Sequence, residues 1–121
     1  MAGAVDVGDD LRGPDAQALI EAILCLRDAE ECRRLLIDLC TIGEVADLAL
    51  RWKVARMLAA GATYEEVASA TGASTATISR IRRFVEHGAG GYRLVASRLA
   101  ESGAPRGGGG DAATGGGRST P

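Results

Sequence analysis

Residues 16–26 are the most restrictive segment of this chain, because these eleven positions hold only two polar side chains, Gln17 and Glu21. The apolar residues recur at intervals of three and four, which predicts a helix, and Pro14 suits its first position. A helix that is apolar around most of its circumference must be covered on several sides. The simplest cover is a second subunit related by a two-fold axis; the alternative is the monomer's own remaining helices.

Low-complexity segments lie at both ends of the chain. Residues 102–121 contain eight glycines, and residues 1–13 are mostly small or acidic, so both are expected to be disordered tails. The folded domain is therefore predicted over residues 14–101 of the 121-residue chain. A folded part this short buries only a small core, which favours association with a second copy.

The fold class predicted from the pattern is all-α with about six helices, because no stretch alternates apolar and polar residues over the length of a strand. Asp28 and Ser74 suit N-caps, Thr41 with Glu44 and Thr63 with Glu66 match the capping box, and Gly61 and Gly72 suit helix ends. The expected helices cover about residues 14–26, 29–40, 42–60, 64–70, 75–86 and 92–100.

Neither a membrane span nor a signal peptide is expected, because the chain lacks a run of 18 apolar residues and begins with an acidic segment. A cytoplasmic location follows. Cys25, Cys32 and Cys40 lack the close pairing of a zinc site and are predicted to be reduced, small core residues. No metal, cofactor or membrane partner is expected.

The net charge of −2 conceals two halves of opposite sign. Residues 1–47 carry four arginines and eleven acidic residues, whereas residues 48–100 carry eight basic and three acidic residues. Phosphate attraction depends on the local field of a basic patch, not on the charge of the whole chain. The acidic pI of the whole chain therefore does not exclude a nucleic-acid partner.

The segment 64–83 fits the helix-turn-helix pattern over twenty residues, within a motif expected over residues 63–87. Ala68 is small where two helices would cross, and Gly72 can supply the positive φ of a tight turn. Val67, Ile78 and Ile81 are spaced to fix the second helix across the first.

A helical wheel separates the second helix of this motif into two faces. Phe84, Ile81 and Val85 share the apolar side, and the opposite side is small near its start and cationic further along, as suits a helix that enters the major groove. An ordinary solvated face is the alternative. The predicted DNA-binding residues are Ser74, Thr75, Ala76, Thr77, Ser79, Arg80, Arg83 and His87.

Residues 39–58, 63–66 and above all 72–80, Gly-Ala-x-x-Ala-Thr-Ile-x-Arg, resemble the tryptophan-repressor superfamily and more closely its YerC/YecD branch. The resemblance covers about residues 15–100. It implies an intertwined homodimer, in which the first three helices of each subunit form a shared core and each subunit presents one helix-turn-helix.

The resemblance also places an effector pocket at Thr41, Arg51 and Arg80, where the tryptophan-binding members hold the ligand's indole between two arginines. Ile81 stands where those members have glycine, and Trp52 adds a large ring next to Arg51. The pocket is therefore expected to be vestigial, and free tryptophan is expected not to act as the effector. Glu65 and Glu66 also stand where the tryptophan-binding members carry basic and polar DNA contacts. The operator sequence of those members therefore cannot be assumed for this protein.

The function predicted from these features is a sequence-specific transcription regulator, a repressor, that binds double-stranded DNA as a homodimer. The alternative is a helical interaction or assembly module in which the helix-turn-helix only packs. An enzyme is not expected, since His87 is the one histidine and no paired carboxylates or nucleophile with a base are evident. The operator, the regulated genes, the direction of regulation, any effector and the role of the glycine-rich tail stay open.

Overall fold

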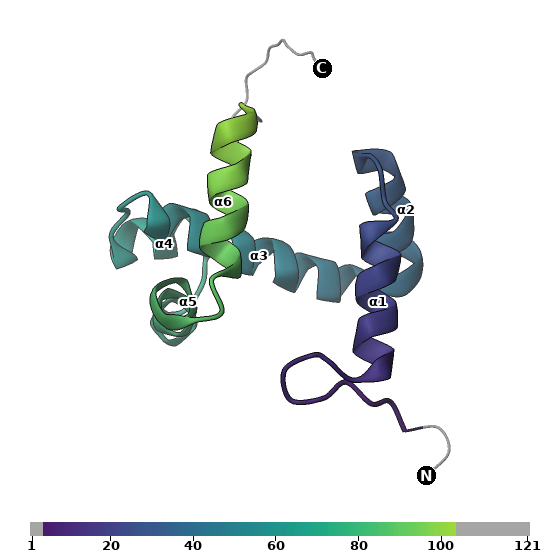
Figure 1. The fold of residues 1–121 in the computed structure, drawn as a ribbon. Coiled ribbons are helices and arrows are strands. Elements are labelled where there is room, and N and C mark those ends of the chain that lie inside the picture. Colours follow the sequence, from purple (N-terminus) through teal and green to yellow (C-terminus); the bar gives the residue numbers. More distant parts are fainter. Residues whose placement is uncertain (1–3, 104–121) are drawn as a thin grey trace. The chain divides into compact units, whose positions relative to one another are not determined.

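The computed structural model describes residues 4–103, which contain six α-helices and no strand (Figure 1). The predicted all-α class is thereby confirmed. Residues 1–3 and 104–121, which include most of the predicted glycine-rich tail, lie outside the described residues. The helices are α1 (Pro14–Leu24), α2 (Ala29–Leu39), α3 (Ile42–Ala59), α4 (Tyr64–Thr71), α5 (Thr75–His87) and α6 (Gly91–Ser102).

The described residues fall into two compact units, with the boundary between positions 45 and 46. The first unit holds α1, α2 and the first turn of α3; the second holds the rest of α3 with α4, α5 and α6. None of the described helices combines the length and the apolar character that crossing a membrane requires.

Four of the helices, α2 to α5, begin where a side chain satisfies free backbone N–H groups, as the sequence predicts. The Asp28 carboxylate accepts from Glu31 N at 2.9 Å. Thr63 and Glu66 form a complete capping box, with Thr63 N donating to Glu66 Oε1 at 2.8 Å and Glu66 N donating to Thr63 Oγ1 at 3.1 Å. Thr41 and Glu44 make the same reciprocal pair at the start of α3.

The first helix ends two residues earlier than predicted. α1 stops at Leu24, and the N–H groups of Cys25 and Leu26 bond to carbonyls three residues back, at Ala22 and Ile23. This tighter last turn ends the helix before the cap of α2. The last helix is longer than predicted, since α6 begins at Gly91 and runs to Ser102.

Residues 6–13, which belong to the predicted N-terminal tail, form a loop that precedes α1 and is closed by hydrogen bonds, two of them to Asp15. Asp6 N donates to Asp15 Oδ2 at 2.7 Å, Asp15 N donates to Asp6 O at 3.1 Å, and Gly13 N donates to Val7 O at 2.8 Å. Gly13 is buried, and a Cβ at this position would collide with the carbonyl oxygen of Asp6. Glycine is therefore required where the loop closes.

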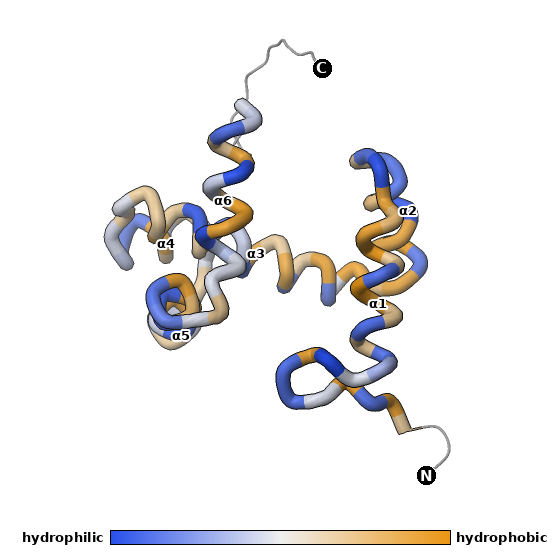
Figure 2. Tube along the Cα trace, in the orientation of Figure 1, coloured by the Kyte–Doolittle hydropathy of each residue, from blue (hydrophilic) through white to orange (hydrophobic). Residues whose placement is uncertain are grey.

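The first unit buries almost no side chain of its own. Among residues 4–45 only Gly13 and Ala16 are buried, and α1 and α2 are apolar along much of their length (Figure 2). The prediction that the cysteines lie in a core is wrong for the single chain, because Cys25 and Cys32 are exposed and Cys40 is half-buried. The exposed large apolar side chains of α1, α2 and the start of α3 are Leu19, Ile23, Leu24, Ile37, Leu39 and Ile42.

The second unit contains a hydrophobic core built by three helices. α3 contributes Val54 and Ala55, α4 contributes Val67, and α5 contributes Ile78, Ile81 and Val85. Val54, Val67 and Ile78 are completely buried. The predicted contacts of Val67, Ile78 and Ile81, which fix the second helix of the motif across the first, are confirmed. The partly buried residues around this core include Leu50, Met57, Leu58, Ala68 and Tyr92.

We expect Ile78→Ala to lower the free energy of unfolding by about 3 kcal/mol, since it removes fully buried methyl groups and leaves a cavity in a small core. Urea denaturation followed by circular dichroism measures the change. Ser79→Ala, at the exposed neighbouring position, is the matched control and should change the unfolding free energy by less than about 0.5 kcal/mol. Equal losses in the two variants would contradict this account of the core.

Candidate functional site

The turn between α4 and α5 is fixed by its own hydrogen bonds. Gly72 adopts φ 76° in the left-handed region, as predicted, and has no heavy atom within 4 Å of the place a Cβ would take. The need for glycine is therefore conformational rather than steric. Thr71 Oγ1 donates to Val67 O at 2.7 Å and accepts from Ala73 N at 3.1 Å. Ser74 then caps α5 by accepting from Thr77 N at 3.2 Å.

α5 has one buried face and one exposed face. Ile78, Ile81 and Val85 point into the core of the second unit. Of the residues predicted to bind DNA, Thr77 is half-buried and its hydroxyl accepts from Ser74 Oγ at 3.1 Å. The exposed ones are Ser74, Thr75, Ala76, Ser79, Arg80, Arg83 and His87.

The prediction that Phe84 belongs to the inward apolar face is wrong, because this side chain is 47% exposed. Its place at the edge of the apolar sector of the wheel explains the difference, since the core closes over Ile81 and Val85 instead. The Arg83 guanidinium carbon lies 5.9 Å from the centre of the Phe84 ring, a cation–π distance. Phe84 therefore supports an arginine of the exposed face.

The three arginines of α5 differ in their partners. Arg82 Nε donates to Glu86 Oε2 at 3.0 Å, and this hydrogen bond, with the charge of Glu86, raises the pKa of Arg82 above its ordinary value. Arg80 and Arg83 have no carboxylate partner among residues 4–103. The exposed face of α5 therefore carries two positive charges that no described acidic residue neutralises.

Of the three residues predicted to form a vestigial effector pocket, one is engaged in a helix cap and two are exposed. Thr41 lies in the first unit, where its Oγ1 accepts from Glu44 N at 3.1 Å. Arg51 and Arg80 lie in the second unit, and both are exposed. Ile81 is 4% exposed and belongs to the core, so its side chain fills space inside the unit.

Trp52, the second residue expected to block that pocket, stacks on α6. Its ring centre lies 6.1 Å from that of Tyr92, with 26° between the ring planes. The indole therefore has an aromatic partner inside the second unit, and its position is fixed by that contact.

The sequence reasoning did not single out Lys53, Arg82 or Arg93. Lys53 Nζ donates to Ala70 O at 3.4 Å, which ties α3 to the end of α4. Arg93 Nε donates to Val85 O at 2.8 Å, which ties α6 to the end of α5. The i,i+4 spacing of Arg82 and Glu86 was a usable signal for their pair. No sequence pattern pointed to the contacts of Lys53 and Arg93, which join separate helices.

The six helices of residues 4–103, with α5 packed across α4 and against α3, place this protein in the class of all-helical TrpR-like folds. The profile of the family "Trp repressor protein" matches residues 15–100. The chain is 48% identical over 94 residues to Uncharacterized protein YerC of Bacillus subtilis (strain 168), covering 78% of this chain and 90% of YerC. It therefore belongs to the Trp repressor family, and the predicted resemblance is confirmed.

A solved structure agrees with this assignment. The crystal structure of a TrpR-like protein from Eubacterium eligens ATCC 27750 superposes with a TM-score of 0.73 at 42% sequence identity. The match covers 77% of this chain and 96% of the Eubacterium chain.

Proposed function

We propose that this protein is a sequence-specific, DNA-binding transcription regulator, in which α4 and α5 act as a helix-turn-helix. The observation that carries the proposal is the exposed face of α5. This face has small side chains near the N-terminus, at Ser74, Thr75 and Ala76, and unneutralised arginines further along, at Arg80 and Arg83. Membership of the Trp repressor family supports the same function.

The chemistry of this face fits a helix that lies in the major groove. The short residues at the start of α5 permit close approach to base edges, and the hydroxyls of Ser79 and Thr75 can donate or accept hydrogen bonds. The N-terminal end of α5 carries the positive end of the helix dipole, which favours a phosphate. Arg80 and Arg83 reach bases or the backbone, and His87 lies in the last turn.

We further propose that the functional unit is a homodimer. The first unit exposes large apolar side chains and buries almost nothing within the single chain, a state that water disfavours. Ile23, Leu24 and Ile42 are 49%, 77% and 81% exposed, respectively, and a second copy would cover such residues.

Selection of bound duplexes from a random library by the purified full chain tests the proposed function. The expected result is one enriched sequence with two-fold symmetry, because a symmetric dimer presents two identical reading helices. Enrichment of no sequence, with retention of the fold, would favour a helical interaction or assembly module instead.

Arg80→Ala and Arg83→Ala should each weaken binding to the selected duplex. If the lost arginine meets a phosphate, the slope of log K against log salt concentration should flatten by up to about one unit. Fluorescence anisotropy across a range of salt concentrations measures both effects. Arg33→Ala, which removes an exposed arginine of α2, is the control and should leave the slope unchanged. Wild-type slopes in both α5 variants would place DNA elsewhere on the molecule.

Ile23→Asp should dissociate the dimer and unfold the protein, since a charge would be buried without a partner at a cost of several kcal/mol. Sedimentation equilibrium at micromolar concentration gives the mass, and circular dichroism gives the helix content. Gln17→Glu, a polar change on the same helix, should leave a dimer. A well-folded monomer in the wild-type protein would overturn the proposed assembly.

Free L-tryptophan should neither bind the wild-type protein nor alter its DNA affinity, because we expect Ile81 and Trp52 to leave no room for a ligand's ring beside Arg51 and Arg80. Calorimetric titration at millimolar tryptophan should show no saturable heat. A tenfold shift in affinity for the selected duplex would contradict this. The double variant Trp52→Val, Ile81→Gly tests the steric cause, and weak recovered binding would support it.

A further inference from the structure

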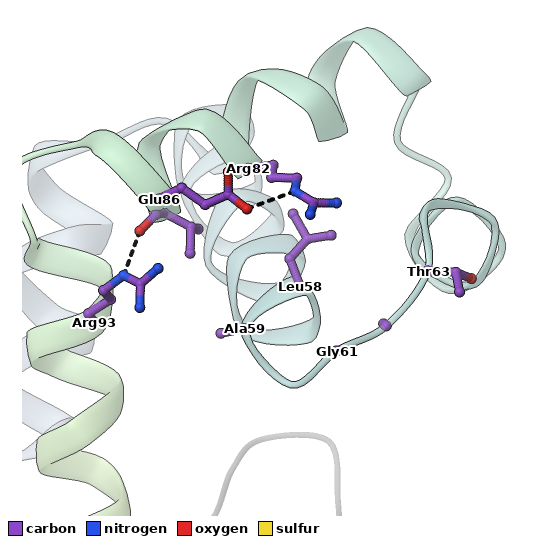
Figure 3. A pocket seen from close by; sticks show the side chains of 9 residues that line it. Leu58, Ala59, Gly61, Thr63, Arg82, Glu86 and Arg93 are labelled. Carbon is purple, nitrogen blue, oxygen red and sulfur yellow. Dashed lines mark hydrogen bonds and ion pairs between the residues drawn. The ribbon is translucent and has the colours of Figure 1, made fainter.

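A cavity of about 420 Å³ lies within the second unit, and its lining includes none of the proposed DNA contacts. The end of α3, the segment that leads into α4, and helices α5 and α6 all contribute to its wall (Figure 3). Its size lies in the range of small-molecule sites in proteins. The side chains that matter for its chemistry are Leu58, Ala59, Arg82, Glu86 and Arg93.

Two guanidinium groups from different helices border this cavity, and each is oriented by a hydrogen bond from its Nε. Arg82 Nε donates to Glu86 Oε2 at 3.0 Å, and Arg93 Nε donates to Val85 O at 2.8 Å. Figure 3 shows Glu86 between the two arginines. The terminal nitrogens of Arg93 make no hydrogen bond to any of residues 4–103, so they are available to a ligand.

The charges and the wall of the cavity define one class of ligand. Two arginines face one carboxylate, which leaves a single excess positive charge. A planar guanidinium matches the geometry of a carboxylate or phosphate group and can bind it through two parallel hydrogen bonds. Leu58 and Ala59 add an apolar surface for a short hydrocarbon part.

We propose that this cavity binds a small oxyanion, a metabolite-sized molecule with a carboxylate or phosphate group held between Arg82 and Arg93. On the helical wheel of α5, Arg82 is roughly 160° from Arg80, and none of the residues that line the cavity is a proposed DNA contact. The wall includes Gly61 and Thr63, which precede α4. A bound anion therefore joins α3, α5 and α6 and holds the α4–α5 pair in one arrangement.

The contacts that orient the arginines are also compatible with a purely structural role. Arg82 and Glu86 form an exposed i,i+4 pair, and such exposed pairs stabilise a helix only weakly. Arg93 satisfies a carbonyl in the last turn of α5. A structural role predicts a change in stability without any dependence on an added anion, so anion binding itself separates the two roles.

Titration of the ¹⁵N-labelled full chain with phosphate and, separately, with succinate tests the proposal, each at ionic strength matched with potassium chloride. We expect saturable amide shifts at residues 58–63, 82–86 and 93 with at least one of the two anions. The anion that binds more tightly identifies the phosphate or carboxylate source. Shifts that fail to saturate, or that potassium chloride reproduces, would overturn the site.

Variants of the two arginines provide the second arm. The double variant Arg82→Gln, Arg93→Gln should weaken anion binding at least tenfold. Arg93→Lys keeps the charge but loses the planar guanidinium, and it should weaken anion binding less. Arg83→Gln is the matched control, because it removes the same charge one residue along on the exposed face. Equal affinity in the double variant and the control would refute the assignment. Circular dichroism establishes that each variant is folded.

A bound anion that holds the α4–α5 pair in one arrangement should also change the affinity for DNA. This regulatory role rests on the proposed DNA binding and is measured separately. With saturating anion, affinity for the selected duplex should change at least threefold in the wild type and not in the double variant. Because anion binding is measured without DNA, failure of the DNA function leaves the site intact. An unchanged DNA affinity would remove the regulatory role alone. Weaker DNA binding in the double variant without any small-anion binding would identify the arginines as DNA contacts and overturn the site.

Discussion

The burial of Ile78 against Val54 and Val67 is the contact on which the second unit depends. These three side chains come from α5, α3 and α4, and each is completely buried. Because the core is this small, the orientation of α5 about its own axis is set by few residues. Turning Ile78, Ile81 and Val85 inward necessarily turns Ser79, Arg80 and Arg83 outward, since the two sets lie on opposite sides of one helix.

The same orientation of α5 gives its arginines different partners. Arg80 and Arg83 have no acidic partner in the part of the chain that the structure describes, whereas Arg82 pairs with Glu86 beside the cavity. Under the two proposals, one helix would present Arg80 and Arg83 to DNA and Arg82 to a small anion. The link between them is the rigid body of the helix, which both ligands would contact.

The first unit carries much of its apolar surface on the outside of the single chain. Residues 4–45 bury Ala16 and Gly13 and leave Ile23, Leu24 and Ile37 at least 49% exposed. Cys25 and Cys32 are exposed for the same reason, not because their polarity favours water. α2 and α3 are capped locally by Asp28 and Thr41, whereas burial of the unit's apolar surface would require the proposed second copy.

The sequence by itself determined the helices and most of their starts, because caps, glycine turns and apolar spacing act over a few residues. The capping box at Thr63, the cap at Ser74, the turn at Gly72 and the inward side of Ile78 were all predictable for this reason. Only the tertiary structure decided that Phe84 is exposed, that Trp52 stacks on Tyr92, and that Arg93 reaches the end of α5. These contacts join residues distant in sequence or depend on how far the core extends, and neither property is encoded in local spacing.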